Sequence, residues 1–251
     1  MLGIIGGIGP TAGADLLQKI TEETKATKDQ EHLPVILFSL PQDIEDRTEY
    51  LRGEVDENPG IQIANIALQL FKLGVTIAGV PCNTAHAPKI FNCIQNELDK
   101  NNSKLKIVHM INESVRYLEK HFHKGSRIGV LSTTGTYEQR IYASKIEEAG
   151  FLPSVPAEKV QHDVVHAAIY HPEYGIKTNN GKVTATAKSK LEEAMNILNK
   201  DGAEAIILGC TELPLAFKEK EYGGMQLIDA TRILARAMIR EYDASKLKDE
   251  E

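Results

Sequence analysis

Two cysteines stand in similar sequence settings and are the residues best suited to chemistry. Cys82 lies in the sequence Val-Pro-Cys-Asn-Thr-Ala-His, and Cys210 lies in Leu-Gly-Cys-Thr-Glu-Leu-Pro. Each follows a short apolar run and precedes what we expect to be a loop that leads into a helix. A helix N-terminus favours a thiolate through its N–H groups and its dipole, so both cysteines are candidate acid/base groups. The third cysteine, Cys93, lies in an amphipathic segment and is expected to pack in the core.

A pair of thiols suits the inversion of a carbon atom that carries a hydrogen. One group removes the proton from one face, and the other delivers a proton to the opposite face, with the roles exchanged in the reverse direction. Asn83, Thr84 and Thr211 offer hydrogen bonds for a substrate carboxylate and for the charge of a carbanion. The residues therefore predict a two-sided proton-transfer site.

Short apolar runs alternate with longer amphipathic segments, which predicts an α/β fold with parallel sheets covered on both faces. The expected strands are 2–5, 35–40, 75–80, 106–110, 127–131, 151–155, 204–208 and 226–228. The expected helices lie near 12–24, 60–73, 86–100, 112–122, 138–149, 182–199 and 230–242. In such sheets the loops at the carboxyl ends of the strands build the site, and both cysteines follow a strand.

An internal repeat relates the two halves of the chain. The segment around Gly3 can be laid over the segment around Gly129, 126 residues later, and Cys210 follows Cys82 by 128 residues. A third pair of segments, at Ile107 and Leu227, is 120 residues apart. This order predicts two pseudo-symmetric α/β domains that face a central cleft, with residues 1–111 plus 230–251 in one and 112–229 in the other. Equivalent loops, and with them the two thiols, would then converge.

Composition limits the classes of partner. The chain has 251 residues, a net charge of −6 and three cysteines, without a polybasic run or an apolar stretch of membrane-spanning length. We therefore expect a cytoplasmic protein with reduced cysteines, which binds a small molecule and neither nucleic acid nor a membrane. An anionic substrate would need local cations, because the protein as a whole is acidic.

The motifs around these cysteines resemble those of the aspartate/glutamate racemase family, and within it the aspartate racemase branch. The resemblance rests on four segments that span nearly the whole chain: 6–11 (GGIGPT), 81–86 (PCNTAH), 134–136 (TGT) and 209–214 (GCTELP). It implies a homodimeric amino-acid racemase that needs neither pyridoxal phosphate nor a metal, with Cys82 and Cys210 as its two bases. Cell-wall glutamate racemases typically have a histidine after the second Cys-Thr, where this chain has Glu212.

The resemblance also implies how a substrate is held. It assigns Arg47 and Lys177 to the side-chain carboxylate of the substrate, with Arg52 close enough to compete with Arg47. The motifs add Thr11, Thr134 and Glu212 to the expected substrate-binding residues. Gln42 and Asp43, on the loop that carries Arg47, could favour a polar substrate other than aspartate, because Asp43 would oppose a second carboxylate. We rank aspartate first, and glutamate or a broader set of amino acids second.

Other interpretations stay open. Gly7, Gly9 and Ala12 fit a dinucleotide fingerprint, although Pro10 removes an N–H donor and the second strand ends without the expected acidic residue. His86, four residues after Cys82, is a candidate partner in a Cys–His hydrolase or a metal site. A non-catalytic amino-acid binder is the third class.

Two segments of the second half carry further expectations. The segment 171–181 is rich in Gly, Asn and Pro, which predicts a mobile loop that closes over the substrate and brings in Lys177. His162 and His166, four residues apart, are expected on a partly exposed helix face.

Overall fold

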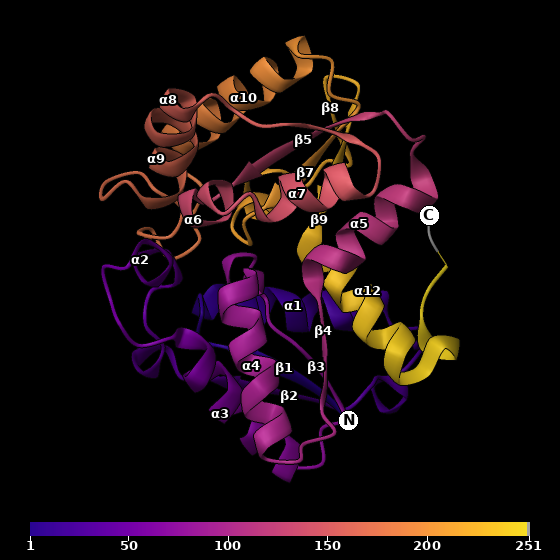
Figure 1. Cartoon of the computed structure of the whole chain (residues 1–251). Coiled ribbons are helices and arrows are strands. Elements are labelled where there is room, and N and C mark those ends of the chain that lie inside the picture. The colour runs from indigo at the N-terminus through magenta and orange to yellow at the C-terminus, as the bar shows by residue number, and fades with distance from the viewer. Residues whose placement is uncertain (250–251) are drawn as a thin grey trace. The chain divides into compact units, whose positions relative to one another are not determined.

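The computed structural model describes residues 1–249 and divides into two compact units (Figure 1). Unit 1 comprises Met1–Glu113 and the chain from Thr231 on, and unit 2 comprises Ser114–Ala230. Both have a parallel sheet as their core, which confirms the predicted α/β class. The assignment of domains with boundaries at residues 111 and 229 stays a prediction. Within the described residues, no helix has the length and apolar character needed to cross a membrane.

Unit 1 contains a four-stranded parallel sheet in the order β2-β1-β3-β4. Its strands are β1 (Leu2–Gly6), β2 (Val35–Ser39), β3 (Ile77–Gly79) and β4 (Lys106–Val108). Its α-helices are α1 (Pro10–Glu23), α2 (Arg47–Arg52), α3 (Pro59–Lys72) and α4 (Pro88–Lys100). Four short 3₁₀ turns complete it: η1 (Asp29–Glu31), η2 (Pro41–Asp43), η3 (Thr84–His86) and η5 (Ala244–Lys246). Two further helices, α5 (Met110–His121) and α12 (Ala230–Asp243), run across the limits of the units.

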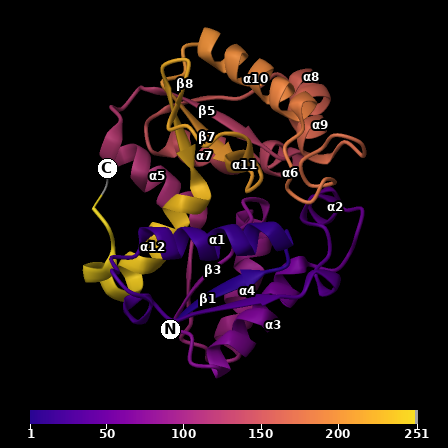
Figure 2. The ribbon, with the colours of Figure 1, turned by 180° about the vertical axis from the view of Figure 1, so that it is seen from behind.

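Helices cover both faces of the sheet in unit 1, because its strands are mostly apolar. The views from two sides place α3 and α4 over one face and α1 and α12 over the other (Figures 1 and 2). Fully buried side chains such as Ile63 and Ile90 join α3 and α4 to strand residues such as Ile5. On the other face, a Cβ added to Gly79 would overlap the sulfur atom of Met238, so α12 packs directly on β3.

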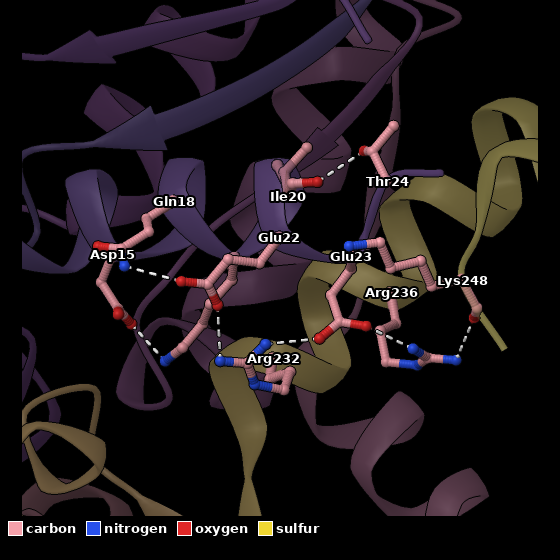
Figure 3. A network of polar contacts seen from close by, with 10 residues as sticks. Asp15, Gln18, Ile20, Glu22, Glu23, Thr24, Arg232, Arg236 and Lys248 are labelled. Atoms are coloured by element: carbon pink, nitrogen blue, oxygen red, sulfur yellow. Dashed lines mark hydrogen bonds and ion pairs between the residues drawn. The ribbon is translucent and has the colours of Figure 1, made fainter. Parts of the chain in front are cut away.

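Ion pairs tie the C-terminal segment to α1 (Figure 3). Glu23 accepts hydrogen bonds from Arg232 and from Arg236, each at 2.5 Å, and Arg232 also reaches Glu22 at 2.9 Å. Backbone hydrogen bonds continue this contact, from Lys25 to the carbonyl of Lys246 and from Lys248 to the carbonyl of Glu23. These contacts explain why the last part of the chain belongs to unit 1.

Unit 2 contains a five-stranded sheet in the order β6-β5-β7-β9-β8. Its strands are β5 (Arg127–Ser132), β6 (Leu152–Ser154), β7 (Ala205–Gly209), β8 (Glu221–Tyr222) and β9 (Met225–Asp229), of which only β8 is antiparallel to its neighbour. Its α-helices are α6 (Thr134–Glu138), α7 (Ile141–Glu148), α8 (Glu158–Val160), α9 (Ala167–Tyr170), α10 (Ala185–Lys200) and α11 (Leu213–Ala216). A π-helical turn, η4 (Gln161–His166), joins α8 to α9.

The two sheets repeat the same plan. The orders β2-β1-β3-β4 and β6-β5-β7-β9 are equivalent, and each connection between parallel strands contains a helix. The strand registers place the repeat-related residues in matching rows, Gly3–Ala78–Ile107 in unit 1 and Gly129–Ile206–Leu227 in unit 2. The registers therefore agree with all three sequence offsets, and they put Cys82 and Cys210 at equivalent positions after equivalent strands.

Several local predictions differ from the structure. The expected helices did not include α2, α6, α8, α9 and α11, and the two-residue strand β8 was also missed. The expected helix 138–149 corresponds to α7, which begins at Ile141, and the helical turn expected at His162 and His166 is π-helical. The segment after Cys82 forms η3, and α4 begins only at Pro88. The helix that follows Cys210 is the four-residue α11. Neither cysteine therefore lies in the first turn of a long helix, contrary to the prediction.

Candidate functional site

In unit 1, the loop after β3 holds Cys82 in a tight turn. The backbone N–H of Cys82 donates to the carbonyl of Val80 at 2.8 Å, and the cysteine itself is partly exposed. Asn83 and Thr84, which follow it, are buried and have polar partners. A partly accessible thiol beside buried amide and hydroxyl groups is suited to meet a small polar substrate.

His86 stabilises this loop through the backbone of Cys82. Its ring is buried, and Nδ1 donates to the backbone carbonyl of Cys82 at 2.9 Å. Burial, and then the neighbouring His109, lower the pKa of His86 to about 3. The imidazole is consequently neutral at physiological pH, and it holds the backbone of Cys82 in place. The geometry does not support the ion pair of thiolate and imidazolium that a Cys–His hydrolase requires.

Arg47 lies at the start of α2, which packs beside η3 and so beside the Cys82 loop. Asp46 caps this helix through hydrogen bonds from the backbone N–H groups of Thr48 and Glu49. The guanidinium of Arg47 donates to the carbonyl of Glu45 at 3.0 Å, and its side chain is only 13% exposed. Arg52, at the other end of α2, is 38% exposed. Of the two arginines, Arg47 is therefore the more buried.

The glycine-rich turn after β1 lies next to the same loops. Gly7 has a φ angle of 92°, and a Cβ there would approach the backbone of Leu40 at 2.9 Å, so the turn packs closely on the chain that follows β2. Thr11, in the first turn of α1, is exposed. Asp43, on η2, is also exposed. Unit 1 thus gathers Thr11, Arg47 and the Cys82 loop at the carboxyl ends of its strands.

In unit 2, Cys210 follows β7 directly and is buried, with 4% exposure. Its Sγ donates a hydrogen bond to Oε2 of Glu212 at 2.9 Å, and the hydroxyl of Thr211 donates to the same oxygen at 3.0 Å. Burial raises the pKa of the Cys210 thiol well above its ordinary value, and the carboxylate of Glu212 raises it further. Cys210 is therefore held in its protonated form, as a neutral thiol.

Lys177 faces Glu212 from the segment 171–181. Its Nζ lies 3.5 Å from Oε1 of Glu212 and 5.2 Å from the centre of the Tyr170 ring. The segment is not the freely moving lid that the sequence predicts, because Ile176 is fully buried and the backbone of Lys177 donates to the carbonyl of Ile169 at 3.0 Å. The ammonium group of Lys177 partly offsets the effect of Glu212 on the Cys210 pKa.

Thr134 begins α6 after β5, the strand beside β7. It is buried, and its hydroxyl shares a hydrogen bond of 2.8 Å with Nδ1 of His166. The sequence analysis placed His166 on a partly exposed helix face, and it missed Tyr170, whose ring stacks on His166 at 4.8 Å. The spacing of four residues between the two rings was the available signal, because it puts them on one side of a helix.

The structure therefore groups the expected site residues by unit. Unit 1 holds Thr11, Arg47, Cys82, Asn83 and Thr84, and unit 2 holds Thr134, Lys177, Cys210, Thr211 and Glu212. Among residues 1–249, no group of three or more His, Cys, Asp and Glu side chains is arranged to hold a metal ion.

Comparisons with known proteins agree with the fold and the motifs. The family model for Asp/Glu/hydantoin racemases matches residues 5–238. The aspartate racemase of Picrophilus torridus, a solved structure, is 28% identical and covers 98% of this chain and 95% of its own, with a TM-score of 0.79. The broad specificity amino-acid racemase RacX of Bacillus subtilis is 24% identical over 248 residues, 96% of this chain and 98% of its own.

A glutamate racemase from Limosilactobacillus reuteri is 27% identical over 175 residues, which are 67% of this chain and 59% of that protein. These relatives are racemases named for different substrates, so they agree on the class of reaction and not on the side chain accepted. Since the family model extends over most of the sequence and both cysteine motifs, the chain belongs to the Asp/Glu/hydantoin racemase family.

Proposed function

We propose that the protein is an amino-acid racemase that inverts the α-carbon by proton transfer between Cys82 and Cys210, without pyridoxal phosphate or a metal. The observation that carries this proposal is the equivalence of the two cysteines, which follow matching strands of two sheets with the same order and register. A single nucleophile would leave the second thiol unexplained. Two thiols on opposite sides of one carbon account for both.

The surroundings of the two thiols suggest how the roles divide. Cys210 donates to Glu212 and its pKa is raised, so it delivers the proton in the resting enzyme, and Cys82 takes one. Asn83, Thr84 and Thr211 hold the α-carboxylate and stabilise the carbanion. After one turnover the two thiols have exchanged roles, and the enzyme is ready for the opposite enantiomer.

Aspartate ranks first as substrate, with glutamate or a broader set of amino acids second. The 28% identity to an aspartate racemase over nearly the whole chain supports this order, as does Arg47 beside the Cys82 loop. Lys177, the second expected cation, already faces Glu212, so a substrate carboxylate would have to share it. This arrangement keeps the broad-specificity alternative open. Two reduced thiols fit a cytoplasmic enzyme, and the family resemblance supports a homodimer.

The test follows proton exchange at the α-carbon. The protein is incubated with L-aspartate, L-glutamate and a panel of neutral amino acids in deuterated water, and both deuterium incorporation and chirality are measured. We expect racemisation with α-deuteration of at least one amino acid. If no amino acid exchanges, the racemase proposal fails, and binding without exchange supports the non-catalytic binder.

Variants of the cysteines test the mechanism. Cys82→Ser and Cys210→Ser should each lower the racemisation rate by roughly 10²- to 10⁴-fold, which is the usual contribution of one acid/base group. Cys93→Ser is the matched control and should leave the rate unchanged. Cys93 is partly exposed on α4 beside Gly60 of α3, and not in the core as the sequence predicts. Full activity of either site variant would exclude the two-base mechanism. Amide or ester hydrolysis that depends on Cys82 and not on Cys210 would support a hydrolase instead.

A further inference from the structure

A continuous line of side chains in unit 2 links the loop after β5 to the Cys210 motif. It runs from Thr134 through His166, Tyr170 and Lys177 to Glu212. His166 and Tyr170 have no part in the proposed reaction so far. Both belong to the stretch of helix between β6 and α10.

The π-helical turn η4 fixes where His166 lies. At its start, Gln161 is fully buried and donates through Nε2 to the carbonyl of Ser132 at 2.9 Å. At its end, His166 shares the 2.8 Å hydrogen bond with Thr134. The first residue of the turn is thus bonded to the last residue of β5, and its last residue is bonded to Thr134 at the start of α6. A π-helical turn forms poorer backbone geometry than an α-helix and is frequent at functional sites.

Tyr170 contacts both His166 and Lys177 and so links them. It lies four residues after His166, and the two rings are stacked at 4.8 Å with an angle of 25°. The Lys177 ammonium lies over the Tyr170 ring at 5.2 Å, an attractive contact with the face of the aromatic ring. The neighbours of the ammonium thus include this ring and Glu212, whose Oε1 lies at 3.5 Å.

We propose that His166 and Tyr170 are positioning residues, which hold the Lys177 ammonium against Glu212 beside the Cys210 thiol. The inference rests on the proposed function, because it gives the thiol its part in proton transfer. It changes the role of two residues, since Glu212 becomes the hydrogen-bond partner of Cys210 and Lys177 becomes the counter-ion of Glu212. Neither has to bind the substrate.

Charge balance explains why such positioning matters. The side chain of Glu212 is only 4% exposed, and a carboxylate buried to this degree needs a partner. The charged groups that act on the Cys210 thiol are Glu212, which raises its pKa, and Lys177, which lowers it. Moving the ammonium away should make the thiol harder to ionise, and Cys210 would then fail when it has to serve as the base.

The test measures the Cys210 thiol directly. In a Cys82→Ser/Cys93→Ser background Cys210 is the only cysteine, and its ionisation is followed by thiolate absorbance against pH. Tyr170→Leu should move the titration to higher pH, in the same direction as Lys177→Met. Tyr170→Phe, which keeps the ring, should rescue the original titration. Tyr174→Leu removes the neighbouring ring that stacks on His171 and is the matched control, which should leave the titration unchanged.

Two variants separate the contacts of His166. His166→Phe keeps the stack on Tyr170 and should retain the titration, whereas His166→Gln keeps a polar partner for Thr134 and should shift it. An unchanged titration in Tyr170→Leu and Lys177→Met would overturn the proposal. Circular dichroism of each variant confirms that it is folded.

Steady-state kinetics of the protein with all three cysteines show whether Lys177 acts as the counter-ion of Glu212 or binds the substrate. If Lys177 acts through Glu212, Tyr170→Leu should lower kcat by about 10-fold and leave KM within about two-fold. A raised KM with unchanged kcat would assign Lys177 to the substrate and overturn the proposal. The titration needs no turnover, so it tests the positioning role even if the racemase proposal fails.

Discussion

His86 provides a prediction that links the site to stability. The ring is buried, lies 4.7 Å from the ring of His109, and donates to the Cys82 carbonyl. Its pKa is lowered to about 3, first by burial and then by His109. In the unfolded chain the same imidazole has a pKa of about 6.5. Between these values the unfolded chain binds a proton that the folded protein does not.

The sign and size of the effect follow from this difference. Because the folded pKa is lowered, the contribution of His86 to stability is fully present above pH 6.5 and is lost as the pH falls toward 3. The slope in that window is about 1.4 kcal/mol per pH unit. Between pH 7.5 and pH 5 the free energy of unfolding should therefore fall by about 2 kcal/mol through His86 alone.

Urea unfolding at pH 7.5, 6 and 5 measures this fall. His86→Gln removes the titrating group, so the variant should lose about 2 kcal/mol less than the wild type over the same range, whatever its stability at pH 7.5. His121→Gln replaces an exposed histidine of α5 and should keep the wild-type pH dependence.

An NMR titration of the histidine rings gives the result that would refute this reasoning. The His86 ring should show no protonation between pH 8 and pH 5. Protonation near pH 6.5, or an equal pH dependence in wild type and His86→Gln, would mean that the imidazole is not buried as described. A pair of Cys82 thiolate and His86 imidazolium would then become possible again.

Three further predictions concern the framework of unit 1. Gly79→Ala should destabilise the protein by about 1–3 kcal/mol in urea unfolding, because the new methyl group overlaps Met238, and Met238→Ala should recover part of the loss in the double variant. Arg236→Met removes one partner of Glu23 and should cost roughly 1–3 kcal/mol in the same assay, with added salt changing the loss little, because Glu23 is only 12% exposed. Gly7→Ala should cost at least about 1–2 kcal/mol from the positive φ angle alone and lower racemase activity, measured by polarimetry, because the turn would move away from β2.

The fold was predictable from the sequence because its signals are local. Each short apolar run became a strand, and the offsets between the halves matched the strand registers residue for residue. The helix α2 also had a signal that was overlooked, since Asp46 with Glu49 three residues later and Gly53 after the end form a capping pattern. The π-helical turn had none, because no residue preference marks the change of hydrogen bonding that shifts His166 toward Thr134.

The site was predictable only in part, because some of its contacts join residues that are far apart in the sequence. The cysteines and their polar neighbours lie together in the sequence, so their common role follows from short motifs. The contact between Lys177 and Glu212 joins residues that are 35 positions apart, and it depends on how the segment 171–181 packs on α9. A composition rich in Gly, Asn and Pro predicted mobility there, but the buried side chain of Ile176 anchors the segment. Tertiary packing outweighed local preference.

The two cysteines occupy equivalent positions in the repeat but have different chemical surroundings. Equivalent strands put them at equivalent positions, yet their neighbours differ: His86 holds the backbone of Cys82, whereas Glu212 accepts directly from the sulfur of Cys210. Two titratable groups in unlike environments are the usual basis for dividing the roles of acid and base. Because Glu212 keeps Cys210 protonated in the resting enzyme, we expect the enantiomer that loses its proton to Cys82 to show the higher initial rate. Replacing Glu212 by Gln should remove that preference, and the two enantiomers would then differ less in their initial rates than they do with the wild type.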